Sequence, residues 1–308
     1  MKTGLIAGLC LVWSLAGCAE AEGPAASPPA DRTVEGAPYV LKGTQVWTVP
    51  DPAQGRDYQV FVSLPPSYDS DAERRYPVLY VTDADYAFPI LRQITRRLNL
   101  QGPVVEEFIL VGLSYAVGED GVASRNRDYT PTAKGVRDAA AHGGGPAYQR
   151  YLKDQVLPFI EGRFRADPER RVLLGHSYGG LLGGQILFTE PEMFSAYVLG
   201  SPSIWFAQRH LMRMETAYAQ AHDDLPAEVF IYIGGWERPG PSRRNTRDTD
   251  MVADVRALES ALKGRGYPSL KISTQVLEDE DHLSVAPLGF TRALVAVLPA
   301  KDAPAQAR

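Results

Sequence analysis

The stretch RVLLGHSYGGLLGGQILF, Arg171–Phe188, joins a short apolar run to a second apolar run through a glycine-flanked serine. Its centre, GHSYG at residues 175–179, is a G-x-S-x-G motif placed where a strand would turn sharply into a helix. Such a turn exposes the serine hydroxyl above the sheet edge, and the N-terminus of the helix favours developing negative charge. The pattern therefore predicts that Ser177 is a nucleophile rather than part of a plain glycine-rich turn.

Short apolar runs continue on both sides of this stretch and are typical of strands in a sheet that is covered on both faces. The predicted strands are Tyr39–Val49, Arg56–Leu64, Pro77–Val81, Phe108–Leu113, Arg171–Gly175, Ala196–Gly200, Val229–Gly234 and Lys271–Leu277. Because helical patterns separate them, we predict an α/β fold with a mostly parallel, doubly wound sheet. The first two strands are expected to pair antiparallel.

Three helical patterns are prominent, at Ala147–Phe164, Asp250–Lys263 and Ser284–Leu298. Pro158 lies inside the first pattern and should kink or break that helix. The second pattern stops before Gly264 and Gly266, which are typical residues for a helix end.

A serine hydroxyl is a weak nucleophile and needs a base. In enzymes with this serine turn the chain order is serine, acid, histidine, so the base should follow the last strand. His282 lies in EDEDHLSV, between the predicted strand Lys271–Leu277 and the last helix, and is the predicted base. His210 and His222 lie in a polar stretch and are interpreted as surface residues.

The acid that orients the histidine should follow the strand before the histidine strand. Glu237 lies three residues beyond Gly234, where the chain leaves that strand, and is the predicted acid. Asp248 and Asp250 are alternatives, and Asp281 or a serine–histidine dyad without an acid remain open.

Two backbone N–H groups are expected to stabilise an oxyanion. One belongs to Tyr178, directly after the serine, and the other to the loop Thr82–Tyr86, which follows the third strand. The string HGGG at residues 142–145 resembles an oxyanion loop of some lipases, but it follows the next strand, too late for that role. We interpret it as a flexible loop near the mouth of the site.

Composition excludes several classes of protein. The chain has 308 residues, 44% hydrophobic and 22% charged residues, and a net charge of −5. This hydrophobic fraction is too high for a disordered chain, and no basic excess is present to bind nucleic acid. Two cysteines, Cys10 and Cys18, are too few for a disulfide scaffold or a thiolate zinc site. We expect neither a metal nor an organic cofactor.

The first 17 residues indicate a secretory signal, because Lys2 precedes a short apolar run, Gly4–Leu15. LAGC at residues 15–18 resembles the bacterial lipobox, which implies a lipid on Cys18 and attachment to a bilayer. The alternatives are an ordinary secreted protein and a buried helix. Ala19 is not the aspartate that retains many lipoproteins in the inner membrane, which favours the periplasmic side of the outer membrane.

We expect a tether at 18–36, one folded domain at 37–298 and a frayed tail at 299–308.

Beyond the serine motif, a set of segments between Leu64 and Phe290 resembles the esterase branch of the α/β hydrolases that includes siderophore (enterochelin and salmochelin) esterases. The matching segments are LPPSYDSD, YPVLYVTDADYAF, RNRDYTPT, VLPFIEGRFRADPERRVLLGHSYGG, FSAYVLGSPSIWF and EDEDHLSV. The resemblance implies an α/β-hydrolase fold, serine hydrolase activity, and a nucleophile and base at Ser177 and His282. Esterase D and feruloyl esterases are wider relatives of this group.

One departure concerns Ala84, where this family usually has glycine. Alanine strongly prefers negative φ, so the second oxyanion donor stays open between Ala84 and its neighbours. By resemblance, Arg127 and Asp128 would lie near the site, with the arginine either holding an anionic substrate or bracing the loop. The further pocket candidates are Asp85, Tyr86 and Trp205, followed by Phe206.

The expected function is that of a lipid-anchored serine esterase acting on a small-molecule ester through an acyl-enzyme. The alternatives are an acyltransferase on the same machinery and a tethered protein that binds a ligand without turning it over. The sequence names neither the substrate nor the oligomeric state.

Overall fold

The computed structural model describes residue 36 and residues 38–301. The predicted signal at 1–17, Cys18 and nearly all of the tether therefore lie outside the described residues. The fold continues past the predicted boundary at residue 298, since the backbone N–H of Ala300 donates to the carbonyl of Val104 at 3.1 Å.

Eight strands form one sheet in the order β1-β2-β4-β3-β5-β6-β7-β8. Pairing is antiparallel for β1–β2 and β2–β4 and parallel for all other neighbours. The strands are β1 Thr44–Asp51, β2 Arg56–Ser63, β3 Tyr76–Thr82, β4 Ile109–Ala116, β5 Ala166–His176, β6 Ala196–Gly200, β7 Glu228–Gly234 and β8 Lys271–Leu277. This topology confirms the predicted α/β-hydrolase fold with antiparallel strands at its N-terminal side.

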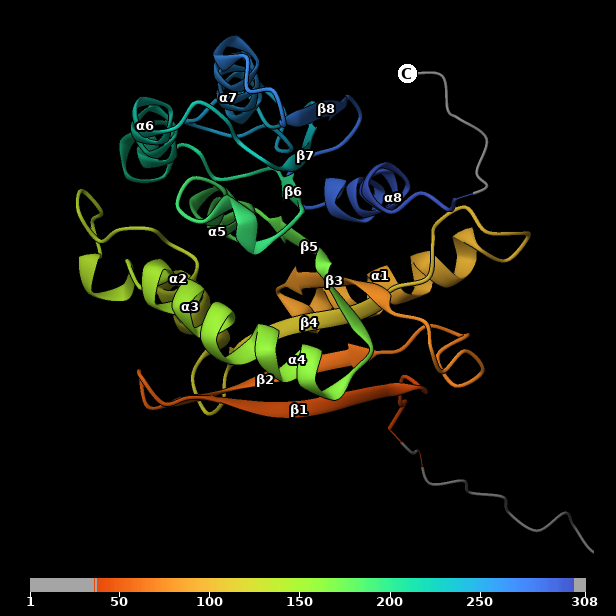
Figure 1. The fold of residues 1–308 in the computed structure, drawn as a ribbon. Coiled ribbons are helices and arrows are strands. Elements are labelled where there is room, and N and C mark those ends of the chain that lie inside the picture. The colour runs from red at the N-terminus through yellow and green to blue at the C-terminus, as the bar shows by residue number, and fades with distance from the viewer. Residues whose placement is uncertain (1–35, 37, 302–308) are drawn as a thin grey trace, which may run out of the picture. The chain divides into compact units, whose positions relative to one another are not determined.

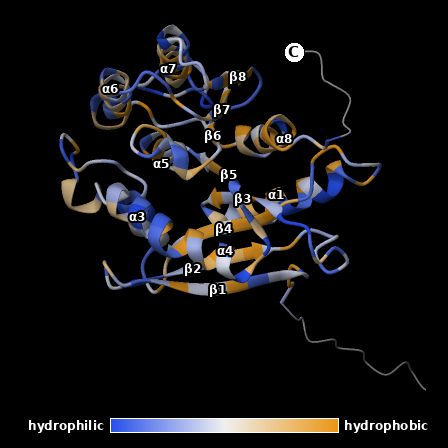
Figure 2. Ribbon diagram, in the orientation of Figure 1, coloured by the Kyte–Doolittle hydropathy of each residue, from blue (hydrophilic) through white to orange (hydrophobic). Residues whose placement is uncertain are grey.

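Helices cover both faces of the sheet, as Figure 1 shows. The α-helices are α1 Ala84–Leu98, α2 Gly121–Asp128, α3 Gly145–Tyr151, α4 Leu157–Arg163, α5 Tyr178–Leu187, α6 Phe206–Ala221, α7 Met251–Arg265 and α8 Val285–Val297. Helices α1 and α8 share one buried apolar cluster with the sheet, while α3 to α7 contribute to a second cluster on the other face. The hydrophobic colouring of the strands in Figure 2 reflects this double cover.

Two predicted strand starts were wrong, and one of them is that of β5, which begins at Ala166 rather than Arg171. The first strand begins at Thr44 rather than Tyr39, because its partner β2 ends at Ser63, which pairs with Thr44.

As predicted, the regular α-helix is interrupted at Pro158: α3 ends at Tyr151, a π-helical segment, Leu152–Val156, follows, and Pro158 lies in the first turn of α4. The wider π-helical turn tolerates the missing hydrogen bond, because proline has no backbone N–H to donate.

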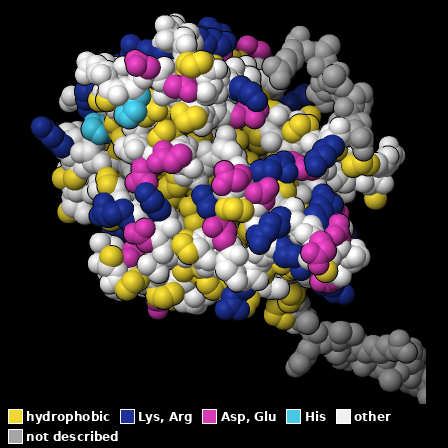
Figure 3. Space-filling view, viewed as in Figure 1, with side chains coloured by type: hydrophobic (Ala, Val, Ile, Leu, Met, Phe, Trp, Pro, Cys, Tyr) yellow, Lys and Arg dark blue, Asp and Glu magenta, His cyan; other side chains and the backbone are white. Residues whose placement is uncertain are grey.

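Helix α7 extends past its predicted end at Lys263, through Gly264 to Arg265. The side chain of Asp250 accepts from the N–H of Ala253, and Gly266 ends the helix in the left-handed conformation with φ 70°. In the part of the chain that the structure describes, no helix is long and apolar enough to cross a membrane. Basic and acidic side chains are interspersed on the face shown in Figure 3, in keeping with the small net charge.

Candidate active site

Ser177 lies in the turn between β5 and α5, at the carboxyl edge of the parallel strands, with φ 61° and ψ −116°. Its N–H is fixed by a 2.8 Å hydrogen bond to the carbonyl of Gly200. A side chain at Gly175 would lie 2.2 Å from the backbone of Gly179, and one at Gly179 would lie 2.2 Å from Oγ1 of Thr82. Only glycine fits at either position, so the turn can form and present the Ser177 hydroxyl.

Three of the predicted residues meet in one hydrogen-bonded chain. Nδ1 of His282 lies 2.6 Å from Oε2 of Glu237, and Nε2 of His282 lies 3.0 Å from Oγ of Ser177. Because Nδ1 faces a carboxylate, it carries the proton, and Nε2 is left to accept a proton from the serine. The Glu237 side chain is fully buried, whereas that of His282 is 32% exposed.

The second oxygen of Glu237 is also held. Oε1 accepts a 2.6 Å hydrogen bond from the hydroxyl of Ser201 and a 2.9 Å hydrogen bond from the N–H of Gly234. These donors fix the plane of the carboxylate and leave Oε2 for His282.

The alternative acids are engaged elsewhere. Asp250 caps α7 through the N–H of Ala253, and Asp248 is exposed. Asp281 accepts from Arg244 at 2.6 Å and from the N–H groups of Leu283 and Ser284, so it ties down the loop that carries His282. The bond from Arg244 lowers the pKa of Asp281 to about 2.

His176, inside the serine turn, is buried beneath the loop of His282. Its Nε2 donates to the carbonyl of His282 at 2.9 Å, and its Nδ1 accepts from the hydroxyl of Tyr232 at 3.3 Å. Burial, and then the nearby charge of His282, lower the pKa of His176 to about 3. His176 is therefore a neutral structural support for the His282 loop.

The two expected oxyanion donors both stand at helix starts. Tyr178 is the first residue of α5, and Ala84 is the first residue of α1, so neither N–H has an acceptor within its own helix. The left-handed residue in the β3–α1 turn is Asp83, with φ 56°. Alanine at position 84 therefore needs no positive φ, and the departure from the family pattern leaves this donor intact.

The HGGG string at residues 142–145 does not serve as an oxyanion loop. The N–H of Gly143 donates to Oγ1 of Thr130, and the N–H groups of Gly144 and Gly145 donate to the carbonyls of Arg127 and Thr130. All three N–H groups are thus used to anchor the loop to the segment that follows α2.

Aromatic side chains surround the start of α5. The rings of Trp205 and Phe206 lie 6.2 and 5.5 Å from that of Tyr178, and the ring of His142 lies 5.6 Å from that of Phe206. Trp205 is 37% exposed, so it can wall a pocket beside the serine.

The side chains of His210 and His222 hydrogen-bond only to residues of α6.

The two remaining pocket candidates follow Ala84 on α1. Asp85 accepts from the hydroxyl of Ser114 at 3.0 Å. The Tyr86 ring stacks on that of Phe290 at 6.4 Å and is 39% exposed. Both stand in the first turn of the helix that carries the Ala84 donor.

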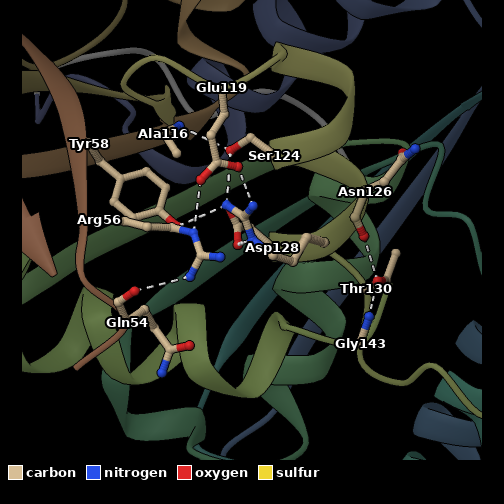
Figure 4. Close-up of polar contacts among 11 residues, drawn as sticks. Gln54, Arg56, Tyr58, Ala116, Glu119, Ser124, Asn126, Asp128, Thr130 and Gly143 are labelled. Carbon is tan, nitrogen blue, oxygen red and sulfur yellow. Dashed lines mark hydrogen bonds and ion pairs between the residues drawn. The ribbon is translucent and has the colours of Figure 1, made fainter. Parts of the chain in front are cut away.

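Arg127 braces α2 and makes no contact with Ser177, His282 or Glu237. Its guanidinium binds Asp128, Glu119 and the hydroxyl of Tyr58. Figure 4 shows how these three partner side chains gather beside α2. Of the two roles that the sequence left open, the structure shows bracing. The arginine that reaches the serine turn is Arg125, which binds Asp83 and the carbonyl of His176.

Sequence reasoning missed Arg125, Asp83 and Ser201. Each lies within a segment that carries the family resemblance, namely RNRDYTPT, YPVLYVTDADYAF and FSAYVLGSPSIWF. The segments were thus the available signal, but no spacing rule singled out these positions.

A large cleft of about 1310 Å³ lies at the opposite edge of the sheet, between the second half of α1 and the start of β4, near Pro65, Arg96 and Glu107. None of the residues of the hydrogen-bonded chain lines it. In a parallel sheet the reactive groups gather where strands end, so we place the site at Ser177 rather than at this cleft.

The chemistry that this arrangement can perform is acyl transfer. A hydroxyl within reach of an oriented imidazole can be deprotonated as it attacks a carbonyl, and two N–H groups at helix starts can receive the resulting negative oxygen. Within residues 38–301, no group of three or more histidine, cysteine, aspartate or glutamate side chains is placed to hold a metal ion.

Comparison with known proteins identifies a matching family and several esterase relatives. The family described as "Putative esterase" matches residues 52–272. The chain is 28% identical over 281 residues to a ferri-bacillibactin esterase of Bacillus subtilis, covering 86% of this chain and 93% of that protein. It is 26% identical over 260 residues to a siderophore triacetylfusarinine C esterase of Aspergillus fumigatus, covering 78% and 88%. The crystal structure of the BES protein from Bacillus cereus superimposes with a TM-score of 0.73 at 26% identity, covering 87% of this chain and 99% of that one.

Proposed function

The chain belongs to the "Putative esterase" family, and we propose that it hydrolyses carboxylic esters with Ser177 as the nucleophile. The observation that carries the proposal is the chain of hydrogen bonds from Ser177 through His282 to the buried carboxylate of Glu237. An esterase of this family needs an activated nucleophile, and this hydroxyl has an oriented base beside it.

The reaction begins when Oγ of Ser177 attacks the ester carbonyl carbon while Nε2 of His282 takes the hydroxyl proton. Glu237 accepts the hydrogen bond from Nδ1 and stabilises the charged imidazolium that forms. The carbonyl oxygen becomes an oxyanion and accepts hydrogen bonds from the N–H groups of Tyr178 and Ala84. Both groups lie at the positive end of a helix, which adds to this stabilisation.

The tetrahedral intermediate then collapses. The bond to the alcohol oxygen breaks, the alcohol takes the proton from His282, and the acyl group stays on Ser177. Water enters, His282 takes its proton, and a second tetrahedral intermediate releases the carboxylic acid and restores the serine hydroxyl.

The substrate class is inferred from relatives and from the aromatic wall. Two relatives are named as a ferri-bacillibactin esterase and a siderophore triacetylfusarinine C esterase. We propose a siderophore-type or other small-molecule ester as the substrate, packed against Tyr178 and Trp205. A panel of aryl, alkyl and catecholate esters would rank these classes by kcat/KM, and a best substrate with no aromatic group would contradict the role of the wall.

A fluorophosphonate probe tests the nucleophile, since it reacts with activated serines. Wild type should be labelled and Ser177→Ala should not. Ser203→Ala is the matched control and should still be labelled. The hydroxyl that it removes is buried and lies 3.4 Å from that of Ser177. Equal labelling of wild type and Ser177→Ala would overturn the assignment.

We also propose that Cys18 is lipidated and anchors the enzyme to the periplasmic side of the outer membrane. Support comes from the LAGC string and from Ala19 after it. Expressed in a Gram-negative host with an alkynyl fatty acid, the wild type and Cys10→Ser should carry the label and fractionate with membranes. Cys18→Ser should do neither, and a labelled Cys18→Ser protein would refute the anchor.

A further inference from the structure

We propose that Arg125 is a positioning residue that holds the two halves of the oxyanion hole at a fixed spacing. The proposal rests on the proposed serine hydrolase function and adds a residue to it that touches neither the nucleophile nor the base.

The two halves of the hole come from separate parts of the chain. The N–H of Ala84 follows β3 and opens α1, while the N–H of Tyr178 follows β5 and opens α5. These helices pack in different apolar clusters, and the pairing of β3 with β5 ends at Val81 and Leu174, so the two turns beyond that pair need a further link. A hydrogen bond to a developing oxyanion weakens steeply when the donor–acceptor distance or angle departs from the optimum. Both donors can reach one oxygen well only if the spacing between them is right.

The guanidinium of Arg125 joins the two segments directly. Its Nε and Nη2 donate to Oδ1 and Oδ2 of Asp83 at 2.7 and 3.1 Å, and Nη2 also donates to the carbonyl of His176 at 3.2 Å. Asp83 immediately precedes Ala84, and His176 lies two residues before Tyr178. A two-pronged arginine–carboxylate pair fixes direction as well as distance, so it suits this task.

The surroundings hold this pair in place. The Asp83 side chain is 1% exposed, and its Oδ1 also accepts from the hydroxyl of Tyr115 at 2.7 Å. Cζ of Arg125 lies 5.3 Å from the ring centre of Tyr178 and 5.7 Å from that of Tyr129. Asp83 adopts the left-handed conformation that only a few residues accept, and these contacts stabilise it there.

Arg127 provides a matched control on the same helix. Its side chain is 22% exposed, against 23% for Arg125, and it also makes ion pairs. The ion pair with Asp128 lies within α2, the other contacts reach Glu119 and the hydroxyl of Tyr58 on β2, and none reaches Asp83 or His176. The two arginines have the same charge and nearly the same exposed fraction, and they differ in which segments they join.

The test compares Arg125→Gln with Arg127→Gln, using p-nitrophenyl esters and counting active sites with a fluorophosphonate. We expect Arg125→Gln to lose about 10- to 100-fold in kcat per labelled site with KM within about threefold, because removal of a whole oxyanion donor costs about 10²- to 10³-fold. Affinity for a phenylboronic acid, which mimics the tetrahedral state, should fall in parallel. Arg127→Gln should keep kcat per site within about threefold.

Two further variants keep the test decisive if Arg125→Gln folds poorly. Arg125→Lys retains charge but cannot form the two-pronged pair, and it should lose kcat in the same way. Asp83→Asn keeps shape, and the double variant Asp83→Asn/Arg125→Lys should be no worse than the poorer single variant, because both changes break one link.

The proposal is overturned if Arg125 variants match Arg127→Gln in kcat per labelled site, or if they change KM alone. Its failure is distinct from failure of the proposed function. If only the positioning role fails, wild type still labels at Ser177 and turns over esters. If the proposed function fails, Ser177→Ala retains label or activity.

Discussion

The hydroxyl of Ser201 donates a 2.6 Å hydrogen bond to Oε1 of Glu237, a residue 36 positions further along the chain. Ser201 is fully buried and has φ 39°, a conformation that serine rarely adopts. The bond leaves Oε2 of the same carboxylate free to face His282.

Ser201→Ala should therefore weaken both the fold and turnover. Loss of a hydrogen bond to a buried charged group costs about 1.5–3 kcal/mol of unfolding free energy, and a looser carboxylate should lower kcat by about tenfold. Urea denaturation and ester kinetics measure the two effects. Ser195→Ala is the control, since that exposed hydroxyl donates only to the carbonyl of Arg171, and it should change neither.

Glu237→Gln should reduce kcat by about 10³-fold or more, because an amide cannot stabilise the charged form of His282 and can select the wrong tautomer. Asp250→Asn is the matched control, as asparagine caps a helix about as well as aspartate and α7 should remain intact. A near-normal kcat for Glu237→Gln, or an inactive Asp250→Asn, would contradict Glu237 as the acid. An inactive Asp250→Asn would favour Asp250 instead.

The pH dependence of the free energy of unfolding should show that His176 is buried and neutral. Its pKa is lowered to about 3 by burial and by the charge of His282, whereas in the unfolded chain it is about 6.5. Between these values the unfolded chain binds a proton that the native one does not. The free energy of unfolding therefore falls as pH drops below about 6.5, by at most about 1.4 kcal/mol per pH unit from this group, and is unaffected above it.

Denaturation of wild type and His176→Gln from pH 7 to pH 4 measures this slope. The variant should show a shallower decline than wild type. His222→Gln, which removes an exposed imidazole, supplies the reference for loss of any histidine. Identical slopes in wild type and His176→Gln would contradict the assignment of a neutral buried imidazole.

Two glycine-to-alanine changes should have opposite effects. Gly175→Ala would place a methyl group 2.2 Å from the backbone of Gly179, and it should abolish labelling of Ser177 and lower the melting temperature. Gly264→Ala, in the last turn of α7, meets nothing within 4 Å and should raise the unfolding free energy by about 0.5–1 kcal/mol. An active Gly175→Ala protein would show that the turn can relax.

Much of the site could be predicted because strong local rules applied to it. A G-x-S-x-G string between two apolar runs identifies the nucleophilic serine. The chain order of serine, acid and histidine then limits the acid and the base to short stretches after predicted strands. Glu237 and His282 could be selected on that basis, and the structure brings both side chains to Ser177. Their catalytic roles remain predictions for the variants to test.

What could not be predicted depends on contacts between distant segments. Arg125 and Arg127 stand two positions apart on α2, and only the register of that helix against the β3–α1 turn decides which one reaches Asp83. The sequence left the second oxyanion donor open, because this family usually has glycine where Ala84 stands. In the structure the positive φ falls one position earlier, at Asp83, whose side chain is held by its partners. The first strand was overextended because its apolar start at Tyr39 has no partner in β2.

The two proposed oxyanion donors begin helices α1 and α5, which cover opposite faces of the sheet, so the reaction rate would depend on how these two helical layers are aligned. A shift of either layer by a fraction of an ångström would reach the chemistry without disturbing a single side chain of the nucleophile, base or acid. On heating, turnover should then fade while helix content is still complete. Inactivation temperature and unfolding temperature would be separate properties of this enzyme, open to separate improvement.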